Sequence, residues 1–303
     1  MTSTSVIFAF FIVIVCIHAK QRPFYNIGHM VNSIKQVNEF LDSGCNALET
    51  DITFSSEGIA LKTYHGKPCD CLRWCGYSEK IEVYLEYTRN LTTPANKMYR
   101  SQYAILLLDL KTNLISKQNL NKAGKLFVDL LYKHLFTFGK SESKLKVVIG
   151  VQRIIHNDFV VGFYEEMKKR GIEDISNQIG WQVAENVHIQ KIAEMWRRID
   201  VVKNIWLSDG ITNCLSSLRS WSRTITMIKM RDECNVQSNS FCARKVYAWT
   251  FDAKRYLRNS LRLNVDGIIT NLPKNLQEVL REDEFKLKYR LANSDDNPWT
   301  IFA

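Results

Sequence analysis

Short apolar runs alternate with segments of helical periodicity along most of the chain. The runs predict eight β-strands, at residues 24–29, 47–54, 104–111, 146–151, 175–183, 204–209, 245–251 and 267–271. Seven helices are predicted, at 33–41, 119–138, 158–169, 187–200, 215–230, 253–264 and 276–281. The clearest is 119–138, where apolar side chains recur every three or four residues and form one stripe.

The order of these elements predicts the fold class. Strands that alternate with helices imply a parallel sheet. Eight such strands favour a (β/α)8 TIM barrel over an open, doubly wound sheet. The doubly wound sheet is the alternative, although no G-x-G-x-x-G motif follows the first strand. No Pro/Gly/Ser-rich linker divides the chain, so residues 20–303 are expected to form a single catalytic domain.

The first residues carry a separate signal. Residues 6–17 form an apolar run of 12, and the small residue Ala19 follows. Such a run is too short to span a bilayer but has the length of the apolar part of a signal peptide. Residues 1–19 are therefore predicted to be a signal peptide, and the protein to be secreted and extracellular. A buried N-terminal strand or helix is the alternative, since MTSTS contains no Lys or Arg.

Composition narrows the classes of partner. The 303 residues include 41 Lys and Arg against 31 Asp and Glu, and 46% are hydrophobic. This balance excludes a disordered or low-complexity chain, and the formal charge of +10 favours anionic partners such as membrane headgroups or phosphate esters. The basic residues are spread along the sequence instead of forming a patch with aromatic residues, so nucleic acid is not an expected partner.

The cysteines are interpreted as disulfides because the protein is predicted to be secreted. Seven follow the predicted signal peptide: Cys45, Cys69, Cys71, Cys75, Cys214, Cys234 and Cys242. The cluster at 69–75 lacks the C-x2-C spacing of a zinc site. A local pair within this cluster, with its third cysteine bonded to a distant partner, is the simplest interpretation. Cys234 and Cys242 enclose a short polar stretch and could close a second loop, which leaves Cys45 as the candidate unpaired thiol.

Acidic residues gather at the C-terminal ends of two predicted strands, the end where a barrel places its chemistry. Glu49 and Asp51 are two residues apart on one strand, so their side chains face the same way. Asp109 and Lys111 repeat this arrangement on the next. Converging carboxylates repel one another unless a cation compensates, and an all-oxygen ligand set suits Mg²⁺ better than Zn²⁺. Ordinary salt bridges to Lys or Arg are the alternative.

Two histidines accompany these carboxylates. His29 ends the first strand and His65 follows a hairpin-like segment. Histidine titrates near neutral pH, so such a pair can divide the two proton transfers of a phosphoester cleavage. A structural histidine that donates to a backbone carbonyl is the alternative, and it is the interpretation for His134, His156 and His188. H-E-x-x-H, G-x-S-x-G and P-loop motifs are absent, which weakens the zinc, serine hydrolase and NTPase interpretations.

Eight segments carry a family resemblance, in this order: GHMVNSI, ALETDITF, YHGKPCDC, LLLDLKT, IWLSDGITNC, YAWTFD, DGIITN and DDNPW. They resemble the secreted sphingomyelinase D or phospholipase D toxins of spiders and ticks, over the span from Arg22 to Phe302. The resemblance implies a barrel like that of the glycerophosphodiester phosphodiesterases, with loops tied by disulfides and the C-terminal DDNPW motif closing one end. The segment GVQRIIHNDFVVGF and the region of Cys234 and Cys242 depart from the spider pattern.

The resemblance also implies roles for individual residues. The catalytic histidines would be His29 and His65, the Mg²⁺ ligands Glu49, Asp51 and Asp109, and the residues around the substrate Lys111, Trp249, Asp252 and Asn271. The implied disulfides are Cys69–Cys75 and Cys71–Cys214.

The implied reaction is removal of choline from sphingomyelin and lysophospholipids such as lysophosphatidylcholine. It would take place at a membrane surface, on a monomeric enzyme, and attack by the lipid's own hydroxyl would yield a cyclic phosphate. Two alternatives are a secreted glycerophosphodiester phosphodiesterase and a catalytically inactive binding homologue.

Overall fold

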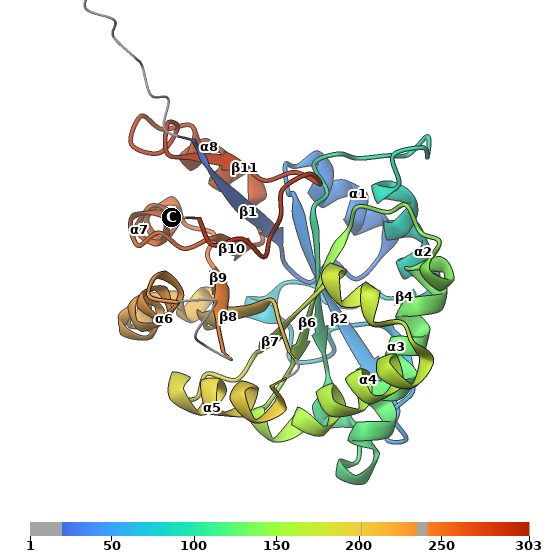
Figure 1. The fold of residues 1–303 in the computed structure, drawn as a ribbon. Helices are drawn as coiled ribbons and strands as arrows, with labels where there is room; N and C mark the ends of the chain where they lie inside the picture. The colour runs from blue at the N-terminus through green and yellow to red at the C-terminus, as the bar shows by residue number, and fades with distance from the viewer. Residues whose placement is uncertain (1–19, 201, 235–240, 303) are drawn as a thin grey trace, which may run out of the picture.

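The computed structural model describes residues 20–200, 202–234 and 241–302 (Figure 1). The predicted signal peptide, residues 1–19, lies outside the described residues. Among the described residues, no helix has both the length and the apolar character needed to cross a membrane.

Eight parallel strands form a closed barrel, which confirms the predicted TIM-barrel class. In chain order they are β1 Arg22–Gly28, β2 Ala47–Phe54, β5 Ile105–Leu110, β6 Lys146–Val151, β7 Ile179–Val183, β8 Ile205–Gly210, β9 Ala243–Trp249 and β10 Gly267–Thr270. Each pairs with its sequence neighbour, and β1 pairs in parallel with both β2 and β10. This last pairing closes the sheet and excludes the open, doubly wound alternative.

A helix follows each barrel strand, and the helices surround the strands (Figure 1). They are α1 Ile34–Asp42, α2 Ile81–Thr92, α3 Leu120–His134, α4 Asn157–Arg170, α5 Ile189–Ile199, α6 Ser222–Asp232, α7 Lys254–Arg262 and α8 Pro273–Leu280. Three short strands lie outside the barrel. β3 Ala60–Thr63 and β4 Glu79–Lys80 extend β2 as an antiparallel sheet, and β11 Tyr289–Leu291 pairs with the start of β1.

Short 3-10 helices occupy the connections. They are η1 Asp70–Leu72, η2 Thr112–Leu114, η3 Lys117–Asn119, η4 Thr137–Gly139, η5 Ile154–His156, η6 Glu173–Gln178 and η7 Asn213–Leu218. Two of them correct predicted elements. The strand predicted at 175–183 begins only at Ile179, because the polar segment before it forms η6. The helix predicted at 215–230 is divided into η7 and α6, since Arg219 has extended backbone.

Two further differences concern helices. The predicted helix 119–138 ends at His134, because Thr137 and Phe138 have φ angles of 48° and 55°. Helix α2 was not predicted. Its buried positions include Tyr84, Thr88 and Thr92 beside aliphatic residues, so its buried face is not marked by a continuous apolar stripe.

Alternation along the strands decides which side chains enter the barrel. Ile105 and Leu107 of β5 belong to the apolar cluster inside the barrel, whereas Leu106 and Leu108 pack outward against the helices. Asp109 continues the inward row. On β2, Ala47 belongs to the inner cluster, and Glu49 and Asp51 follow it at the same spacing. The pleat therefore turns all three carboxylates toward the barrel axis.

The C-terminal tail lies at the opposite end of the barrel from these carboxylates. Trp299 packs edge-on against Trp206, and its indole nitrogen donates to the carbonyl of Asn177 at 2.9 Å. A Cβ at Gly180 would lie 2.5 Å from the Trp299 ring, so glycine at the start of β7 makes room for it. Tail and barrel thus meet below the apolar inner cluster.

Candidate active site

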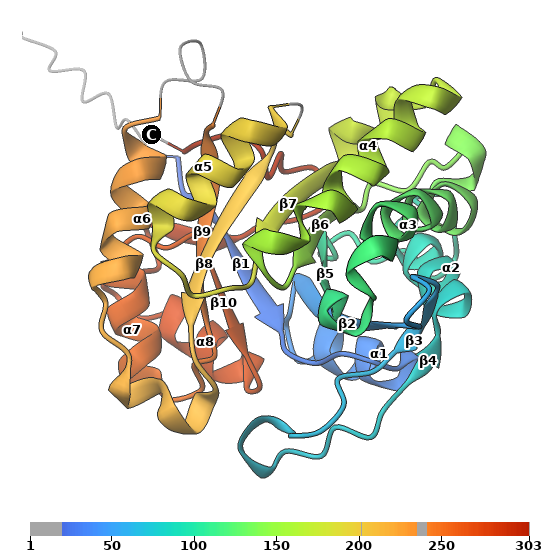
Figure 2. The same ribbon diagram turned by 90° about the horizontal axis from the view of Figure 1, so that it is seen from below.

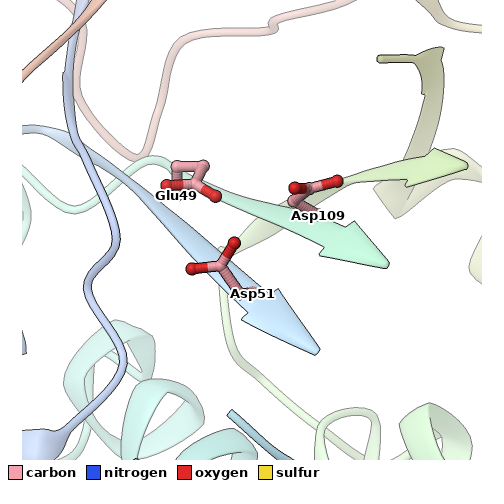
Figure 3. Close-up of side chains that lie close together, drawn as sticks. All are labelled: Glu49, Asp51 and Asp109. Atoms are coloured by element: carbon pink, nitrogen blue, oxygen red, sulfur yellow. The ribbon is translucent and has the colours of Figure 1, made fainter. Parts of the chain in front are cut away.

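Three carboxylates form the centre of the site. Glu49 and Asp51 come from β2 and Asp109 comes from β5, and Figure 3 shows them pointing toward one another. An oxygen from each lies within 4.8 Å of the others. Asp51 and Asp109 are also directly opposite in the register of the two strands. Because Glu49 and Asp51 are buried, their charges meet with little screening by water.

The protein compensates this negative charge only in part. Lys111 Nζ lies 2.6 Å from Asp51 Oδ1 and 2.7 Å from Asp109 Oδ2. Burial opposes a charge on Lys111, but the Asp109 and Asp51 carboxylates outweigh it and raise the pKa of Lys111. Ordinary salt bridges, the alternative to a metal site, are therefore present, but they involve a single ammonium, that of Lys111, which Asp51 and Asp109 share. Three carboxylates around one lysine leave an excess of negative charge.

Glu49 is the carboxylate whose charged form this excess disfavours most strongly. Burial, and then the charges of Asp51 and Asp109, raise the pKa of Glu49 well above its usual range. Its Oε2 accepts a 2.6 Å hydrogen bond from the backbone N–H of Met30, whose φ of 50° places it in a tight turn after β1. Oδ1 of Asp109 is buried without a hydrogen-bond partner in the described part of the chain. Crowded, partly unpartnered carboxylate oxygens fit a hard divalent cation.

Asn32 fixes the orientation of Asp51. Its amide Nδ2 donates to Asp51 Oδ2 at 2.7 Å, and its Oδ1 accepts from the backbone N–H of Asp51 at 2.9 Å. Burial raises the pKa of Asp51, but Lys111, His65 and this Asn32 hydrogen bond outweigh it and keep that pKa below its usual value. The Asn32 amide is thus an orienting group that the sequence analysis missed.

His29 is held by its Nδ1 atom. Nδ1 lies 2.9 Å from Asn271 Oδ1, and an amide oxygen only accepts, so Nδ1 carries the proton and Nε2 is left as an acceptor. Arg73 Nη1 donates to that same Oδ1 at 2.5 Å and to the His29 carbonyl at 2.7 Å. Burial lowers the pKa of His29, although the Asp70 carboxylate 3.6 Å from Nδ1 acts in the opposite direction.

Asp252 orients Asn271 in turn. Its carboxylate accepts from the Asn271 backbone N–H at 2.7 Å, from Asn271 Nδ2 at 2.9 Å and from Thr270 Oγ1 at 2.9 Å. Asn213 Nδ2 donates to the same group at 2.6 Å. Asp252 is therefore fully engaged behind the pocket, and it reaches His29 through Asn271.

His65 is the second histidine of the site. It follows β3, and its Nδ1 donates to the carbonyl of Gly66 at 2.9 Å, which leaves Nε2 as an acceptor. A backbone carbonyl partner is what a structural histidine would have, yet His65 also lines the pocket. The other three histidines of the described residues do not line the wall of this pocket. His134 binds Glu86, His156 binds Thr112, and His188 caps α5.

A pocket of about 340 Å³ joins these groups. Its lining comprises His29, Glu49, Asp51, His65, Asp109, Gln152, Gln182, Ala184, Ser208, Tyr247, Trp249, Thr250 and Ile269. A second cavity, of about 380 Å³, shares His29, His65, Trp249 and Thr250 with it and is otherwise walled by Pro68, Cys69, Asp70, Cys71, Thr212 and Cys214. Both histidines therefore lie where the two spaces meet.

The sequence analysis missed the polar residues on the far wall of this pocket. Gln182 and Ser208 lie within β7 and β8, and Gln152 directly follows β6. Tyr247 donates its hydroxyl proton to Gln182 inside the barrel. A polar residue that interrupts an apolar strand near its C-terminal end was the signal available for Gln182 and Ser208.

Three disulfides are present: Cys69–Cys75, Cys71–Cys214 and Cys234–Cys242. The first two are the pairings that the resemblance implies. Cys71–Cys214 joins the loop after β3 to the loop after β8, across 143 residues of sequence. Of the cysteines in the described ranges, Cys45 stays unpaired and is buried.

Comparison with known proteins identifies the family of the chain. Residues 19–299 match the family model described as dermonecrotic toxin SPH. The chain belongs to the dermonecrotic toxin family. It is 41% identical to the dermonecrotic toxin StSicTox-betaIB1i of Sicarius terrosus, over 92% of this chain and 98% of that protein. It is 40% identical to the dermonecrotic toxin Hl-PLD1 of Hemiscorpius lepturus, over 92% of this chain and 85% of that one.

Solved structures agree on the fold. The crystal structure of a putative glycerophosphodiester phosphodiesterase from Galdieria sulphuraria matches with a TM-score of 0.51 at 13% identity, and covers 87% of this chain and 100% of its own. At that identity the likeness shows the barrel alone. The family match confirms the predicted resemblance to the secreted toxins of spiders.

Proposed function

We propose that the protein is a secreted, Mg²⁺-dependent enzyme of the phospholipase D type that releases choline from sphingomyelin and lysophospholipids. The observation that carries this proposal is the buried carboxylate cluster of Glu49, Asp51 and Asp109, which lines one pocket with two histidines that each expose an acceptor nitrogen. Family membership supports the reaction class.

The three carboxylates would hold the metal. A bound Mg²⁺ supplies positive charge that stabilises the phosphate as negative charge builds on its oxygens. Lys111 lies against Asp51 and Asp109, so its ammonium adds a second positive charge beside the same phosphate. Lys111 thereby binds and orients the diester.

His29 and His65 would move the protons. One Nε2 accepts the proton of the attacking hydroxyl while the new oxygen–phosphorus bond forms, and the other histidine, protonated, donates to the choline oxygen as its bond to phosphorus breaks. With the lipid's own hydroxyl as nucleophile, the products are free choline and a cyclic phosphate. Asp252 and Asn271 keep His29 in the required tautomer.

Phosphorus NMR of the products tests this proposal. Incubation with sphingomyelin is expected to give cyclic ceramide phosphate. EDTA is expected to abolish this product, and the substitution His29→Asn is expected to lower its rate of formation sharply. Turnover of glycerophosphocholine alone would favour the alternative of a glycerophosphodiester phosphodiesterase. Absence of turnover of either compound would favour an inactive binding homologue.

We also propose that residues 1–19 are a signal peptide and that the exported protein is a monomer. The apolar run at 6–17 followed by Ala19 supports cleavage there. The intact mass of protein secreted from insect cells should correspond to a chain that begins at Lys20. A mass that includes residues 1–19 would contradict it.

A further inference from the structure

Large apolar side chains are exposed on the loops around the pocket. They are Trp74, Leu114, Ile155, Leu215, Leu218 and Leu272, which we call the rim. Five of them lie in loops that directly follow barrel strands β5, β6, β8 or β10, and Trp74 lies in the long loop after the β2–β3 hairpin. All six therefore belong to the end of the barrel that carries the site. Exposed apolar groups gathered on one face mark an interaction surface.

Two of the rim loops are fastened together. The disulfide Cys71–Cys214 joins them, and the buried Asp70 carboxylate accepts hydrogen bonds from the Thr212 hydroxyl and, at 3.3 Å, from the Asn213 backbone N–H. Figure 2 shows both loops projecting on the same side of the barrel, one between β3 and β4 and the other between β8 and α6.

The most exposed members of the rim lie just beyond these fastenings. Trp74 and Leu218 are 72% and 77% exposed. Directly after Leu218, Arg219 Nε donates to the buried Asp209 at 3.1 Å and anchors the loop from behind. The disulfide and hydrogen bonds at the base of these loops thus hold Trp74 and Leu218 outward. Both residues stay exposed to water although large apolar side chains are usually buried.

The base of the rim is also a wall of the substrate space. Pro68, Cys71, Thr212 and Cys214 line the second cavity, which contacts both His29 and His65. Whatever covers the rim therefore lies at the entrance to the site. Exposed Lys67 and Lys117 lie in the same set of loops, where they suit the phosphates of a lipid headgroup layer.

We propose that the rim inserts its apolar tips into the outer leaflet of a lipid bilayer, so that a phospholipid enters the pocket directly from the membrane. This inference rests on the proposed function, because it assigns a docking face to the same site. Apolar tips beside lysines match the layered polarity of a bilayer, with acyl chains below and phosphates at the level of the ammonium groups.

Vesicle binding separates docking from catalysis. Wild type and the variants Trp74→Ser, Leu218→Ser and the double variant are sedimented in EDTA with vesicles of phosphatidylcholine and sphingomyelin. The matched control is Leu287→Ser, because Leu287 is 76% exposed but lies between α8 and β11, away from the rim. Each single rim variant should partition about tenfold more weakly, and the double variant more weakly still, whereas the control should match wild type.

The same variants are then assayed with lysophosphatidylcholine below its micelle concentration. Their turnover of this dispersed substrate should equal that of wild type, and their thermal midpoints should be unchanged because both side chains are exposed. Wild-type binding to vesicles without any turnover would overturn the proposed function and leave the docking face standing.

Two results would overturn the docking face. One is equal vesicle binding by the rim variants and wild type, or no binding by an active wild type. The other is a wild-type dimer in analytical ultracentrifugation that the rim substitutions convert to monomer without a change in vesicle binding, which would assign the rim to contact between copies of the chain.

Discussion

The candidate site contains side chains that hold its carboxylates and histidines in place. Asn32 binds Asp51 twice, and Asp252 acts on His29 through Asn271. The neutral amides of Asn32 and Asn271 thus orient Asp51 and His29 without adding charge to the site. A group that fixes a ligand or a tautomer changes activity without touching the reacting atoms.

Loss of Asn32 should weaken the metal site. The substitution Asn32→Ala removes both hydrogen bonds to Asp51 and should raise the Mg²⁺ concentration needed for half-maximal activity by roughly 10–100-fold. Asn38→Ala is the matched control, since Asn38 bonds to Tyr87 on the outside of the barrel. The measurement is a Mg²⁺ titration of choline release after EDTA treatment. An unchanged titration curve for Asn32→Ala would contradict the proposed metal site.

Substitution of His29, or of the Asp252 carboxylate that acts on it through Asn271, should lower the rate of the chemical step. His29→Asn should lower kcat about 10²–10⁴-fold, and Asp252→Asn should lower it by less, because the Asn271 contact with His29 would be loosened but not lost. The check is steady-state kinetics with dispersed lysophosphatidylcholine. If Asp252→Asn altered KM alone, Asp252 would act on substrate binding and not on the histidine.

At the scale of secondary-structure elements, two glycines allow α3 and α4 to pack closely. Helices α3 and α4 approach so closely that a Cβ at Gly124 would lie 1.9 Å from the carbonyl oxygen of Phe159, and one at Gly162 would lie 2.0 Å from that of Asn121. Backbone atoms cannot move aside like a flexible side chain. The two glycines therefore fix the distance between neighbouring helices.

Enlarging either glycine should separate the helices. Gly124→Ala is expected to lower the free energy of unfolding by about 1–3 kcal/mol, despite the better helix propensity of alanine. Lys122→Ala, at an exposed position of the same helix, should leave stability unchanged. Urea denaturation followed by circular dichroism measures both. A Gly124→Ala protein as stable as the control would mean that α3 and α4 adjust freely.

The elements also show how far the sequence could predict this structure. Strand periodicity placed Glu49, Asp51 and Asp109 on inward positions, and the closed barrel then follows from eight alternating units. Helix α2 was not predicted because its buried face includes hydroxyl-bearing side chains and therefore shows no continuous apolar stripe. The contact of Asn32 with Asp51, and the place of Gln152 on the pocket wall, depend on three-dimensional closure. Local periodicity carries no information about such contacts.

At the scale of the whole molecule, a buried ionic cluster joins distant parts of the barrel. The carboxylate of Asp266 binds Arg22 of β1 and Arg231 of α6, each at 2.5 Å, and lies 3.8 Å from Lys245 of β9. Burial raises the pKa of Asp266, but Lys245, Arg22 and Arg231 outweigh it and lower that pKa below its usual value. Strand β1, helix α6 and strand β9 are thus linked through one buried carboxylate.

The cluster predicts a specific dependence of stability on pH. Because the folded pKa of Asp266 lies below its unfolded value of about 3.9, its contribution is complete above that value and is lost as pH falls through the folded pKa. Asp266→Asn should cost about 3–5 kcal/mol at pH 7 and flatten the acid limb of a plot of thermal midpoint against pH. Asp283→Asn, at a side chain 95% exposed, is the control and should change neither. Parallel acid limbs in both variants would refute the assignment.

Closure of the barrel through β1 has a consequence for biosynthesis. His29 ends the first strand, but the oxygen that fixes its tautomer belongs to Asn271, 242 residues later, directly after the last barrel strand. A ribosome must therefore release nearly the entire polypeptide before the proposed acid–base pair can be assembled. Nascent or proteolytically shortened chains that end before that asparagine would contain all three carboxylates of the cluster but would lack the partner of His29, so the proposed activity would require the completed chain.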